Sequence, residues 1–538
     1  MLPSLPHPLP SRPGLPMAIG RCVGVAMVLA CLLAVGCGAS PPSSAPPTNE
    51  PTEPVAGGEL IVATLADAGR LDPHMVTDAA SMRIIENLYS TLLTYGEGYG
   101  DFRNDLATSL EISDDQLVYT LELRKGAMFH SGRVVTAEAV KFSLQRIIDK
   151  GVRAQHFDVI ESIEVVDPHR LTLTLSRPSA PFRSYLAHPM NAIVDPQAVE
   201  EADGKLDSTD AGSGPFKLVT WKRDQRIVMT RHDGYHVEGR PYLDRLVFRP
   251  ITDQTARTTA LRTGEVHLVL EVSPKDVMIL NKAAGVTVES VPGTFWEYIG
   301  LNCAKPPFDD ARLRRAVAYG VDRAQLNQLV KFGKATELYG GHIPPNHWAH
   351  ADLTLFKDKN PGDARFLFDA AGVEEPLPVE LIVDSGVSYQ VRAAEVIKQQ
   401  LEPVGFAVTI RGLESSVFFD RLGRGDFEMT VVGWMGFVDP DQWTWNLFHS
   451  EGKYNQQGYA NAEVDELLGR GRRPLDRAAR QEIYAEAQRL IAEEAPMVFL
   501  YLNDQASAWR DTVHGYRVHP TATSRALVDT WISDHIGR

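Results

Sequence analysis

Short apolar runs alternate with longer amphipathic segments along most of the chain. Residues 60–65 (LIVATL) are typical of a short buried strand, and the alternation at 117–123 and 171–175 is typical of half-buried antiparallel strands. The stretch after Pro73 through Leu92 has a helical pattern, as does the segment that opens at Thr136 (TAEAVKFSLQRII), which resembles a capping box.

The second half of the chain repeats this mixture. Residues 380–384 predict a strand, 389–401 a helix and 407–410 a second strand, which together make a βαβ-like unit. Residues 427–432 predict a further strand. The clearest helix covers 477–495 and is stopped by Pro496, and strand 497–502 follows. The pattern therefore predicts an α/β protein, without a repeat of solenoid length.

The N-terminal pattern is different and predicts a targeting segment. Residues 1–22 contain two arginines and no acid, and residues 23–36 are an apolar run of 14 residues. A membrane-spanning helix needs about 20 apolar residues, so we expect residues 1–36 to be a secretory signal peptide. The Leu-Ala-Val-Gly before Cys37 resembles a bacterial lipobox, which predicts lipidation of Cys37. A conventional cleaved signal is the alternative, and either Met1 or Met17 can be the start.

Residues 37–58 are rich in Pro, Ser, Thr and Gly and predict a flexible, lipid-anchored tether. Two or more acyl chains give a stable anchor. We therefore expect the protein at the periplasmic or extracellular face of the bacterial cytoplasmic membrane, with the outer membrane as a second candidate location. The Gram type stays open.

Charge and cysteine content exclude several classes of function. The 538 residues include 54 Lys and Arg against 69 Asp and Glu, which gives a net charge of −15. The sequence has no stripe of basic residues, so we do not expect a nucleic-acid partner. Of four cysteines, only Cys303 lies beyond residue 37, so we expect neither a disulfide framework nor a multi-cysteine metal site.

No catalytic motif withstands inspection. The chain lacks G-x-x-x-x-G-K-[ST] and H-E-x-x-H, and we interpret His342, His347 and His350 as part of a surface loop and not as a zinc site. Ser450 and Lys453 match S-x-x-K, but Gly452 lies between them and no partner motif follows. We therefore expect no enzymatic activity, cofactor or metal, with a secreted serine hydrolase as a remote alternative.

An aromatic stretch suggests a small-molecule site. Residues 433–450 (GWMGFVDPDQWTWNLFHS) follow a predicted strand, and ligands of open α/β sheets bind beyond the carboxyl ends of strands. Aromatic walls with few polar groups suit such a pocket. For any single tryptophan here, a place in the core is an equal alternative.

One family resemblance covers residues 59–535. Residues 104–146 (NDLATSLEISDDQLVYTLELRKGAMFHSGRVVTAEAVKFSLQRI) resemble the signature of the peptide/nickel (family 5) solute-binding proteins of bacterial ABC importers. Ser131 stands where the family usually has Asp, and His267 where it often has Asp. Further matches are Leu71-Asp72-Pro73-His74, Gly212-Ser213-Gly214-Pro215-Phe216, Pro306-Pro307-Phe308-Asp309, Asp322-Arg323, Gly433-Trp434 and Asp439-Pro440-Asp441.

The resemblance implies a two-lobed clamshell of the periplasmic-binding-protein type (type II, cluster C-like) with an extra inserted domain in the first lobe. The first lobe would combine 59–89, 196–293 and 501–538 with the inserted domain 90–195. The second lobe would be 294–500, with hinges near Pro292-Gly293 and near Tyr501.

By the same resemblance the protein would be a monomeric lipoprotein that captures a peptide or peptide-like solute between its lobes and delivers it to ABC permease subunits. A sensor, or a binder of a non-peptide solute such as a metal chelate or oligosaccharide, is the alternative. The sequence does not decide the identity or length of the ligand, or whether the protein serves transport or sensing.

The resemblance also suggests pocket residues. Trp434, Met435, Gly436, Phe437 and Asp439 would come from one lobe, and Thr77, Asp78 and Ala79 from the other. Asn455 and the hinge residue Tyr501 would join them, with Trp434 and Tyr501 close together across an uncharged, aromatic gap. Arg421 could receive a ligand carboxylate, although a solvated helix charge is the more ordinary interpretation.

Position 437 departs from the family's peptide binders. They often have an Asp three residues after the Gly-Trp tryptophan, where it pairs with the ligand's α-ammonium, and here that residue is Phe437. Losing this carboxylate should weaken binding of a free amino terminus unless Asp439 or Asp78 substitutes, and Phe437→Asp should strengthen it.

Overall fold

The computed structural model describes residues 53–96, 98–150, 152–207, 209–357, 360–436, 438–473 and 476–533. Residues Pro51–Arg538 form one compact unit. The predicted signal peptide, Cys37 and Phe437 lie outside the described residues. Among the helices described, none has both the length and the apolar character needed to span a bilayer.

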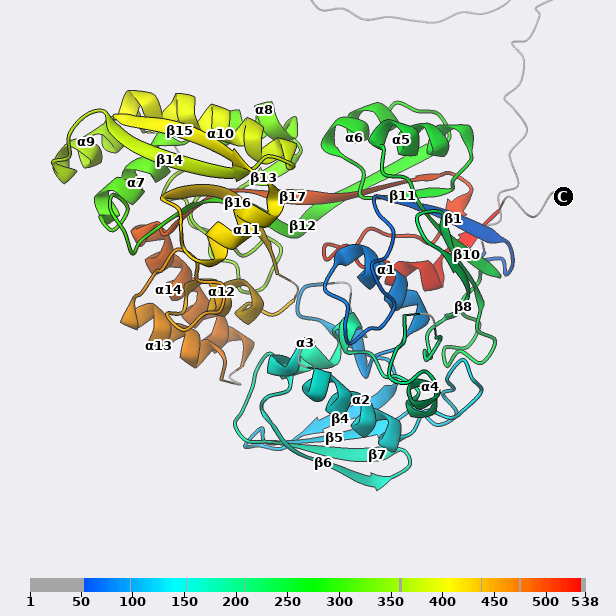
Figure 1. The fold of residues 1–538 in the computed structure, drawn as a ribbon. Helices are drawn as coiled ribbons and strands as arrows, with labels where there is room; N and C mark the ends of the chain where they lie inside the picture. The colour runs from blue at the N-terminus through cyan, green and yellow to red at the C-terminus, as the bar shows by residue number, and fades with distance from the viewer. Residues whose placement is uncertain are drawn as a thin grey trace, which may run out of the picture. The chain divides into compact units, whose positions relative to one another are not determined.

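One large mixed sheet runs through the unit (Figure 1). Its 11 strands follow the order β15-β14-β16-β12-β17-β11-β1-β10-β9-β8, and β13 also pairs with β17. These strands are β1 (Glu59–Thr64), β8 (Phe216–Lys222), β9 (Arg226–Arg231), β10 (Arg245–Pro250), β11 (Leu268–Leu270), β12 (Val286–Leu301), β13 (Ala335–Glu337), β14 (Leu377–Asp384), β15 (Phe406–Leu413), β16 (Met429–Met435) and β17 (Met497–Arg510).

The two longest strands, β12 and β17, join two lobes. They pair along Val286–Pro292 and again along Trp296–Gly300, with an irregularity between Pro292 and Trp296. One end of β17 pairs with β11 and the far end of β12 pairs with β16, so the pair of strands passes from one lobe into the other. The prediction of a two-lobed α/β fold is confirmed.

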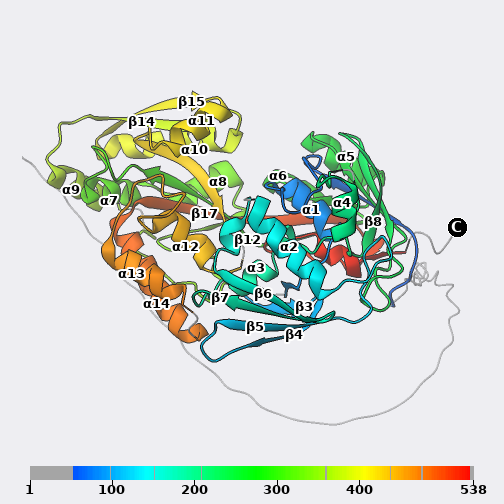
Figure 2. The same cartoon turned by 60° about the horizontal axis from the view of Figure 1, so that its bottom comes forward.

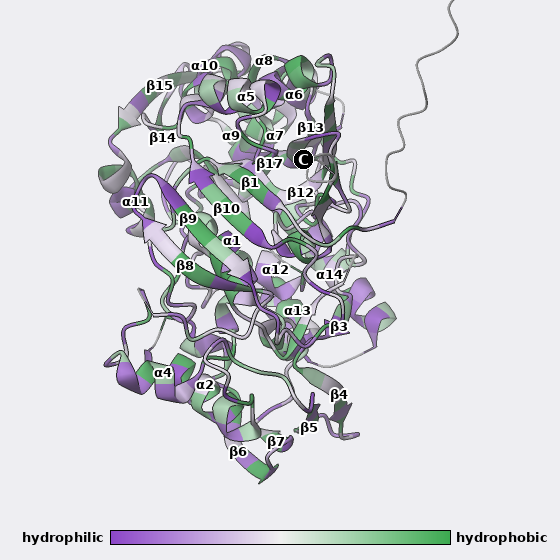
Figure 3. Cartoon of the chain, turned by 90° about the vertical axis from the view of Figure 1, so that its right-hand side faces the viewer, coloured by the Kyte–Doolittle hydropathy of each residue, from purple (hydrophilic) through white to green (hydrophobic). Residues whose placement is uncertain are grey.

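The first lobe is built on β8 to β11 and β1, with helices against them. β9 and β10 each carry three consecutive buried residues, visible as green stretches in Figure 3, because both faces of this part of the sheet are covered. The helices and short elements of this lobe are α1 (Ala79–Leu88), η2 (Pro189–Asn191), α4 (Pro196–Glu201), α5 (Gln254–Thr263), α6 (Pro274–Leu280), β18 (Val513–His514), η4 (Arg525–Asp529) and β19 (Trp531–Ile532).

A separate four-stranded antiparallel sheet, β4-β5-β7-β6, has its own apolar core and comes forward in Figure 2. The strands predicted at 117–123 and 171–175 are confirmed as β5 and β7, which pair directly. The elements here are β2 (Leu93–Tyr95), β3 (Phe102–Asn104), β4 (Ala107–Ile112), β5 (Val118–Leu123), α2 (Ala137–Lys150), η1 (Ala154–His156), β6 (Ile160–Asp167), β7 (Arg170–Leu175) and α3 (Phe182–Leu186).

The second lobe contains the predicted βαβ unit. β14 and β15 pair in parallel, and the helix between them buries Ala394, Ile397 and Leu401. The helix predicted at 477–495 is α14, which Asp476 caps and Ala495 ends in a left-handed conformation. The helices of this lobe are α7 (Ala311–Gly320), α8 (Arg323–Lys331), α9 (Pro361–Ala371), α10 (Ser388–Leu401), η3 (Glu402–Val404), α11 (Ser415–Gly423), α12 (Asp441–Phe448), α13 (Ala462–Gly471) and α14 (Arg477–Glu494).

The surface-loop interpretation of the histidines is wrong for two of them. His342 and His347 are buried, with 0% and 3% exposure. The His342 ring packs against the rings of Phe448 and Phe499 at 4.9 and 5.2 Å, so an aromatic cluster takes the segment into the core. Within the described ranges no group of three or more His, Cys, Asp or Glu side chains could hold a metal ion.

Candidate ligand-binding site

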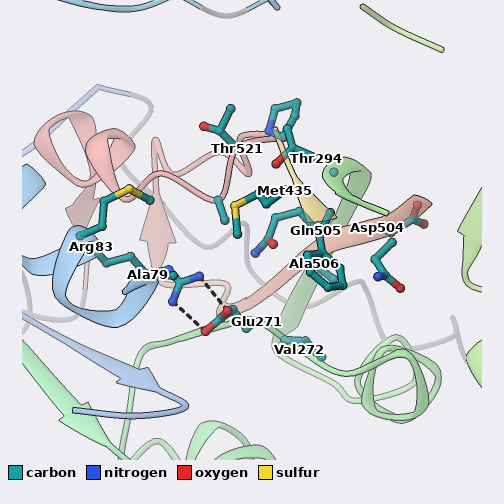
Figure 4. A pocket seen from close by; sticks show the side chains of 16 residues that line it. Ala79, Arg83, Glu271, Val272, Thr294, Met435, Asp504, Gln505, Ala506 and Thr521 are labelled. Atoms are coloured by element: carbon teal, nitrogen blue, oxygen red, sulfur yellow. Dashed lines mark hydrogen bonds and ion pairs between the residues drawn. The ribbon is translucent and has the colours of Figure 1, made fainter. Parts of the chain in front are cut away.

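A cavity of about 270 Å³ lies where the two lobes meet on β12 and β17 (Figure 4). This volume is near the lower end of the range for small-molecule sites, about 300–1,000 Å³. The described residues that line it come from both lobes and from both connecting strands. They are contributed by α1, by the two residues after β11, by positions 293–295 of β12, by Met435 at the end of β16, by positions 503–506 of β17 and by positions 520–522.

The start of α1 positions the first wall of the cavity. Asp78 caps the helix by accepting the backbone N–H of Ser81 at 2.7 Å, which fixes where the helix begins. Ala79, Met82 and Arg83 then lie on one face, since residues three and four apart are neighbours on a helix.

An ion pair connects this wall to the end of β11. Arg83 Nη1 donates to Glu271 Oε2 at 2.8 Å, and Arg83 Nη2 lies 2.7 Å from Glu271 Oε1. The Arg83 side chain is only 5% exposed, whereas Glu271 is 30% exposed. Both side chains contribute to the cavity lining, and Figure 4 shows the guanidinium beside the carboxylate.

Glu271 has an unusual backbone conformation. Its φ is +58°, in the left-handed region that residues other than glycine seldom adopt. Such a conformation costs of order 1–3 kcal/mol and persists only where the surroundings impose it. The two contacts with Arg83 supply that constraint on the side chain.

The β17 wall offers amide groups. Asn503 Nδ2 donates to Glu297 Oε1 at 2.9 Å, and the same carboxylate oxygen lies 2.5 Å from Lys331 Nζ. This buried ion pair fixes Asn503 from behind. Gln505, two residues further along β17, leaves the same face of the strand as Asn503 and extends toward Arg83 in Figure 4.

Two of the residues predicted from the sequence line the cavity, Ala79 and Met435. Trp434 and Gly436 flank Met435. Trp434 is half-buried and donates its Nε1–H to the carbonyl of Gln442 at 3.3 Å. A Cβ on Gly436 would lie 2.1 Å from the ring of Trp443, so only glycine fits beside that fully buried tryptophan. Phe437 is outside the described residues.

Thr77 and Asp78 are exposed at the start of α1 and are not among the described lining residues. The Asp78 carboxylate is already used twice, because it also accepts the Ser81 hydroxyl at 2.8 Å.

The remaining predicted residues have structural partners away from the cavity lining. Asp439 forms a buried pair with Arg480, at 2.8 and 3.1 Å. Asn455 Nδ2 donates to the carbonyls of His449 and Tyr459, which closes a turn. Arg421 lies 2.7 Å from Glu380 and does not reach the cavity lining.

The sequence predicts that Trp434 and Tyr501 lie close together across an uncharged gap, and the structure differs from this prediction in two respects. Trp434 pairs with Trp296 and Glu297 with Tyr501, so the two aromatic side chains lie on opposite faces of the sheet and belong to different apolar clusters. The cavity wall also carries charge, in Arg83 and Glu271. Tyr501 is completely buried and is not among the described lining residues.

Arg83, Glu271 and Gln505 were missed from the sequence, although two of them follow known rules. Arg83 is one helical turn after Ala79, and Glu271 directly follows the carboxyl end of strand β11. Gln505 lies in the middle of a long strand, and nothing in its neighbourhood distinguishes it.

Comparison with known proteins agrees with this architecture. Residues 101–455, more than half of the chain, match the family of bacterial extracellular solute-binding proteins, family 5 (middle region). The chain belongs to this family. Its members are binding proteins that work outside the cytoplasmic membrane with bacterial ABC importers, and the family 5 fold confirms the predicted type II clamshell.

This family 5 protein resembles several characterised members over most of its length. It is 28% identical over 479 residues to the glutathione-binding protein GsiB of Salmonella choleraesuis (strain SC-B67). The aligned region covers 87% of this chain and 93% of GsiB. The periplasmic binding protein DppA of Helicobacter pylori in complex with the peptide STSA is 27% identical, with a TM-score of 0.76 over 89% of this chain and 98% of DppA. The binding protein AgaA of A. tumefacien R10 in complex with agropinic acid is also 27% identical, with a TM-score of 0.76 over 89% of this chain and 99% of AgaA.

Proposed function

We propose that this protein captures a short peptide or peptide-like solute in the cavity on β12 and β17 and delivers it to an ABC permease. The observation that carries the proposal is the position of the cavity, whose lining comes from both lobes and from the irregularity between Pro292 and Trp296. A ligand there contacts both lobes at once, so it binds the closed arrangement more tightly than the open one.

The ligand class is inferred from relatives and from the cavity. GsiB is named for glutathione, and DppA holds a peptide. The cavity combines apolar Met82 and Met435 with charged and amide groups, which suits a solute with both kinds of surface. Its volume favours a short ligand over a long peptide.

The residues proposed to contact the solute are revised from the sequence prediction. We keep Ala79 and Met435, with Trp434 and Gly436 supporting Met435 from either side. We add Arg83, Glu271 and Gln505. The assignment of Asp439, Asn455, Tyr501 and Arg421 to the site is not retained in the proposal, since each has the structural partners or burial described above.

Native mass spectrometry of freshly purified protein, followed by calorimetry and X-ray scattering, tests the function. We expect a retained peptide or peptide-like solute, and a radius of gyration that decreases when that solute is added back to stripped protein. A retained non-peptide solute, for which AgaA with agropinic acid is the precedent, would place the protein with non-peptide binders. Binding without any change in radius would contradict the closure mechanism.

We also propose that the mature protein is a monomer anchored by lipid on Cys37, with residues 38–58 as its tether. The lobe boundaries given above (59–89, 196–293 and 501–538, with 90–195 inserted, against 294–500) are part of the same proposal. Metabolic labelling with a radioactive fatty acid tests the anchor: label should enter the wild-type protein and be lost in Cys37→Ser. Equal labelling of both proteins would exclude Cys37 as the acceptor.

A further inference from the structure

The cavity needs a carboxylate if its ligand carries a free ammonium group, and the usual family position is occupied by Phe437. This question rests on the proposed function, a peptide-like ligand in the cavity. A buried ammonium requires an anionic or strongly accepting partner, so the described carboxylates near the site can be compared one by one.

Both carboxylates that the sequence suggested as substitutes are already committed. Asp78 accepts the backbone N–H and the hydroxyl of Ser81, and it is not among the described lining residues. Asp439 is 7% exposed and accepts two N–H groups of Arg480 at 2.8 and 3.1 Å. Neither can turn to a ligand without leaving a helix N-terminus or a buried guanidinium unsatisfied.

Two carboxylates contribute to the described cavity lining, Asp504 and Glu271. Asp504 precedes Gln505 on β17, so its side chain leaves the opposite face of the strand, and Figure 4 shows it on the far side of β17 from Arg83 and Glu271. Its carboxylate accepts the hydroxyl of Ser290 at 3.3 Å. Asp504 therefore reaches the cavity lining from the face of β17 opposite to Gln505, and its carboxylate already accepts one hydrogen bond.

Glu271 meets the requirement. Arg83 contacts each of its oxygens once, at 2.7 and 2.8 Å, and each oxygen of a carboxylate can accept a second hydrogen bond. The Glu271 side chain is 30% exposed, whereas the Arg83 side chain is 5% exposed. The left-handed backbone at +58° shows that the carboxylate is held in a place that the chain would not choose by itself.

We propose that Glu271, held by Arg83, is the acceptor for the ammonium group of the solute and replaces the carboxylate missing at position 437. The solute class is thereby narrowed to peptides or peptide-like compounds with a free primary amine. Because Arg83 neutralises most of the charge of Glu271, the ammonium gains mainly charge-assisted hydrogen bonds, and we expect a preference of about tenfold over the blocked amine.

The experiment compares two libraries on the same protein. A mixture of dipeptides and tripeptides with free amino termini, and the same mixture N-acetylated, compete for stripped protein, and native mass spectrometry counts what is retained. Four proteins are measured: wild type, Glu271→Gln, Arg83→Gln and the matched control Glu380→Gln, whose carboxylate is 29% exposed, pairs with Arg421 and is not among the described lining residues. Since only folded protein retains peptide, the ratio of free to acetylated ligand does not depend on how much of a variant folds.

We expect the wild type and Glu380→Gln to retain free-amino peptides about tenfold better than acetylated ones, and Glu271→Gln to lose that preference. Arg83→Gln tests whether the Glu271 carboxylate recognises the ligand or only stabilises the fold through its ion pair with Arg83. It leaves the Glu271 carboxylate without its counter-charge, so the preference should persist or increase. A preference that survives in Glu271→Gln, or disappears in Glu380→Gln, would overturn the proposal.

The two proposals fail in different ways. If the wild type retains both libraries equally, the peptide-binding function stands and the role of Glu271 is wrong. If the wild type retains neither library, the proposed function fails, and the assignment of Glu271 falls with it.

Discussion

Single buried histidines have consequences for stability at low pH. Burial lowers the pKa of His342 to about 3 and the pKa of His347 and His74 to about 4. Each folded-state pKa is below the ordinary value of about 6.5, so below that pH the unfolded chain binds more protons than the folded chain. Stability is fully present at pH 7 and is lost as the pH falls from about 6.5 toward these lower values.

His342→Phe isolates one of these contributions. Phenylalanine suits a site lined by Trp296, Phe448 and Phe499 and cannot be protonated. Between pH 7 and pH 5 the wild type should lose about 2 kcal/mol more unfolding free energy than the variant. Urea unfolding at both pH values measures this difference, and parallel losses in the two proteins would show that His342 is protonated in the folded state.

At the level of elements, one buried ion pair fastens α14 to the segment before α12. Arg480 on α14 donates to both oxygens of Asp439, and both side chains are 9% exposed. Breaking one member of such a pair leaves the other charge buried without a partner. The pair therefore holds the start of α12 against α14.

Asp439→Asn should lower the unfolding free energy by about 3–5 kcal/mol, because Arg480 stays buried and charged. Its affinity for the solute at low temperature should stay close to that of the wild type, since Asp439 is not among the described lining residues. The double variant Asp439→Leu with Arg480→Met should recover most of the stability. Urea unfolding and calorimetry test this, and a large loss of affinity with unchanged stability would return Asp439 to the binding site.

The elements were more predictable than the site because they depend on local sequence. The βαβ unit at 377–413 and helix α14 follow from periodicity and from stop signals such as Pro496. The partner of Asp439 could not be predicted, since Arg480 is 41 residues away and is brought near only by packing. The same holds for His342, whose burial depends on rings from β12, α12 and β17.

At the scale of the whole molecule, the cavity is assembled from segments between residues 79 and 522. Met435 was accessible to sequence reasoning through the aromatic stretch around it. Glu271 was also accessible in principle, because it directly follows the carboxyl end of β11, whereas Gln505 becomes a wall residue only when β17 pairs with β11 and β12. Family resemblance supplied the clamshell, and it could not supply the residues in which this chain departs from its relatives.

The lobes also meet at a second place, apart from β12 and β17. Between β2 and β3, the Tyr99 ring lies 5.3 Å from the ring of His347, and the carbonyl of Gly100 accepts a hydrogen bond from Arg477 Nη2 of α14 at 3.2 Å. The Arg477 side chain also lies 3.6 Å from Asp101 Oδ1. These contacts favour the arrangement of lobes in which β2, β3 and α14 are close, so removing one of them should shift the population of lobe arrangements.

Arg477→Gln should therefore shift the solute-free protein toward more separated lobes. Because Arg477 is 56% exposed and the contact is a surface ion pair, we expect a larger radius of gyration without solute and an affinity lowered by no more than about fivefold. Arg424→Gln is the matched control, since that exposed arginine pairs with Asp420 one helical turn away, within a single lobe. X-ray scattering and calorimetry on both variants test the contact, and equal changes in the two would assign the effect to lost surface charge and not to the meeting of the lobes.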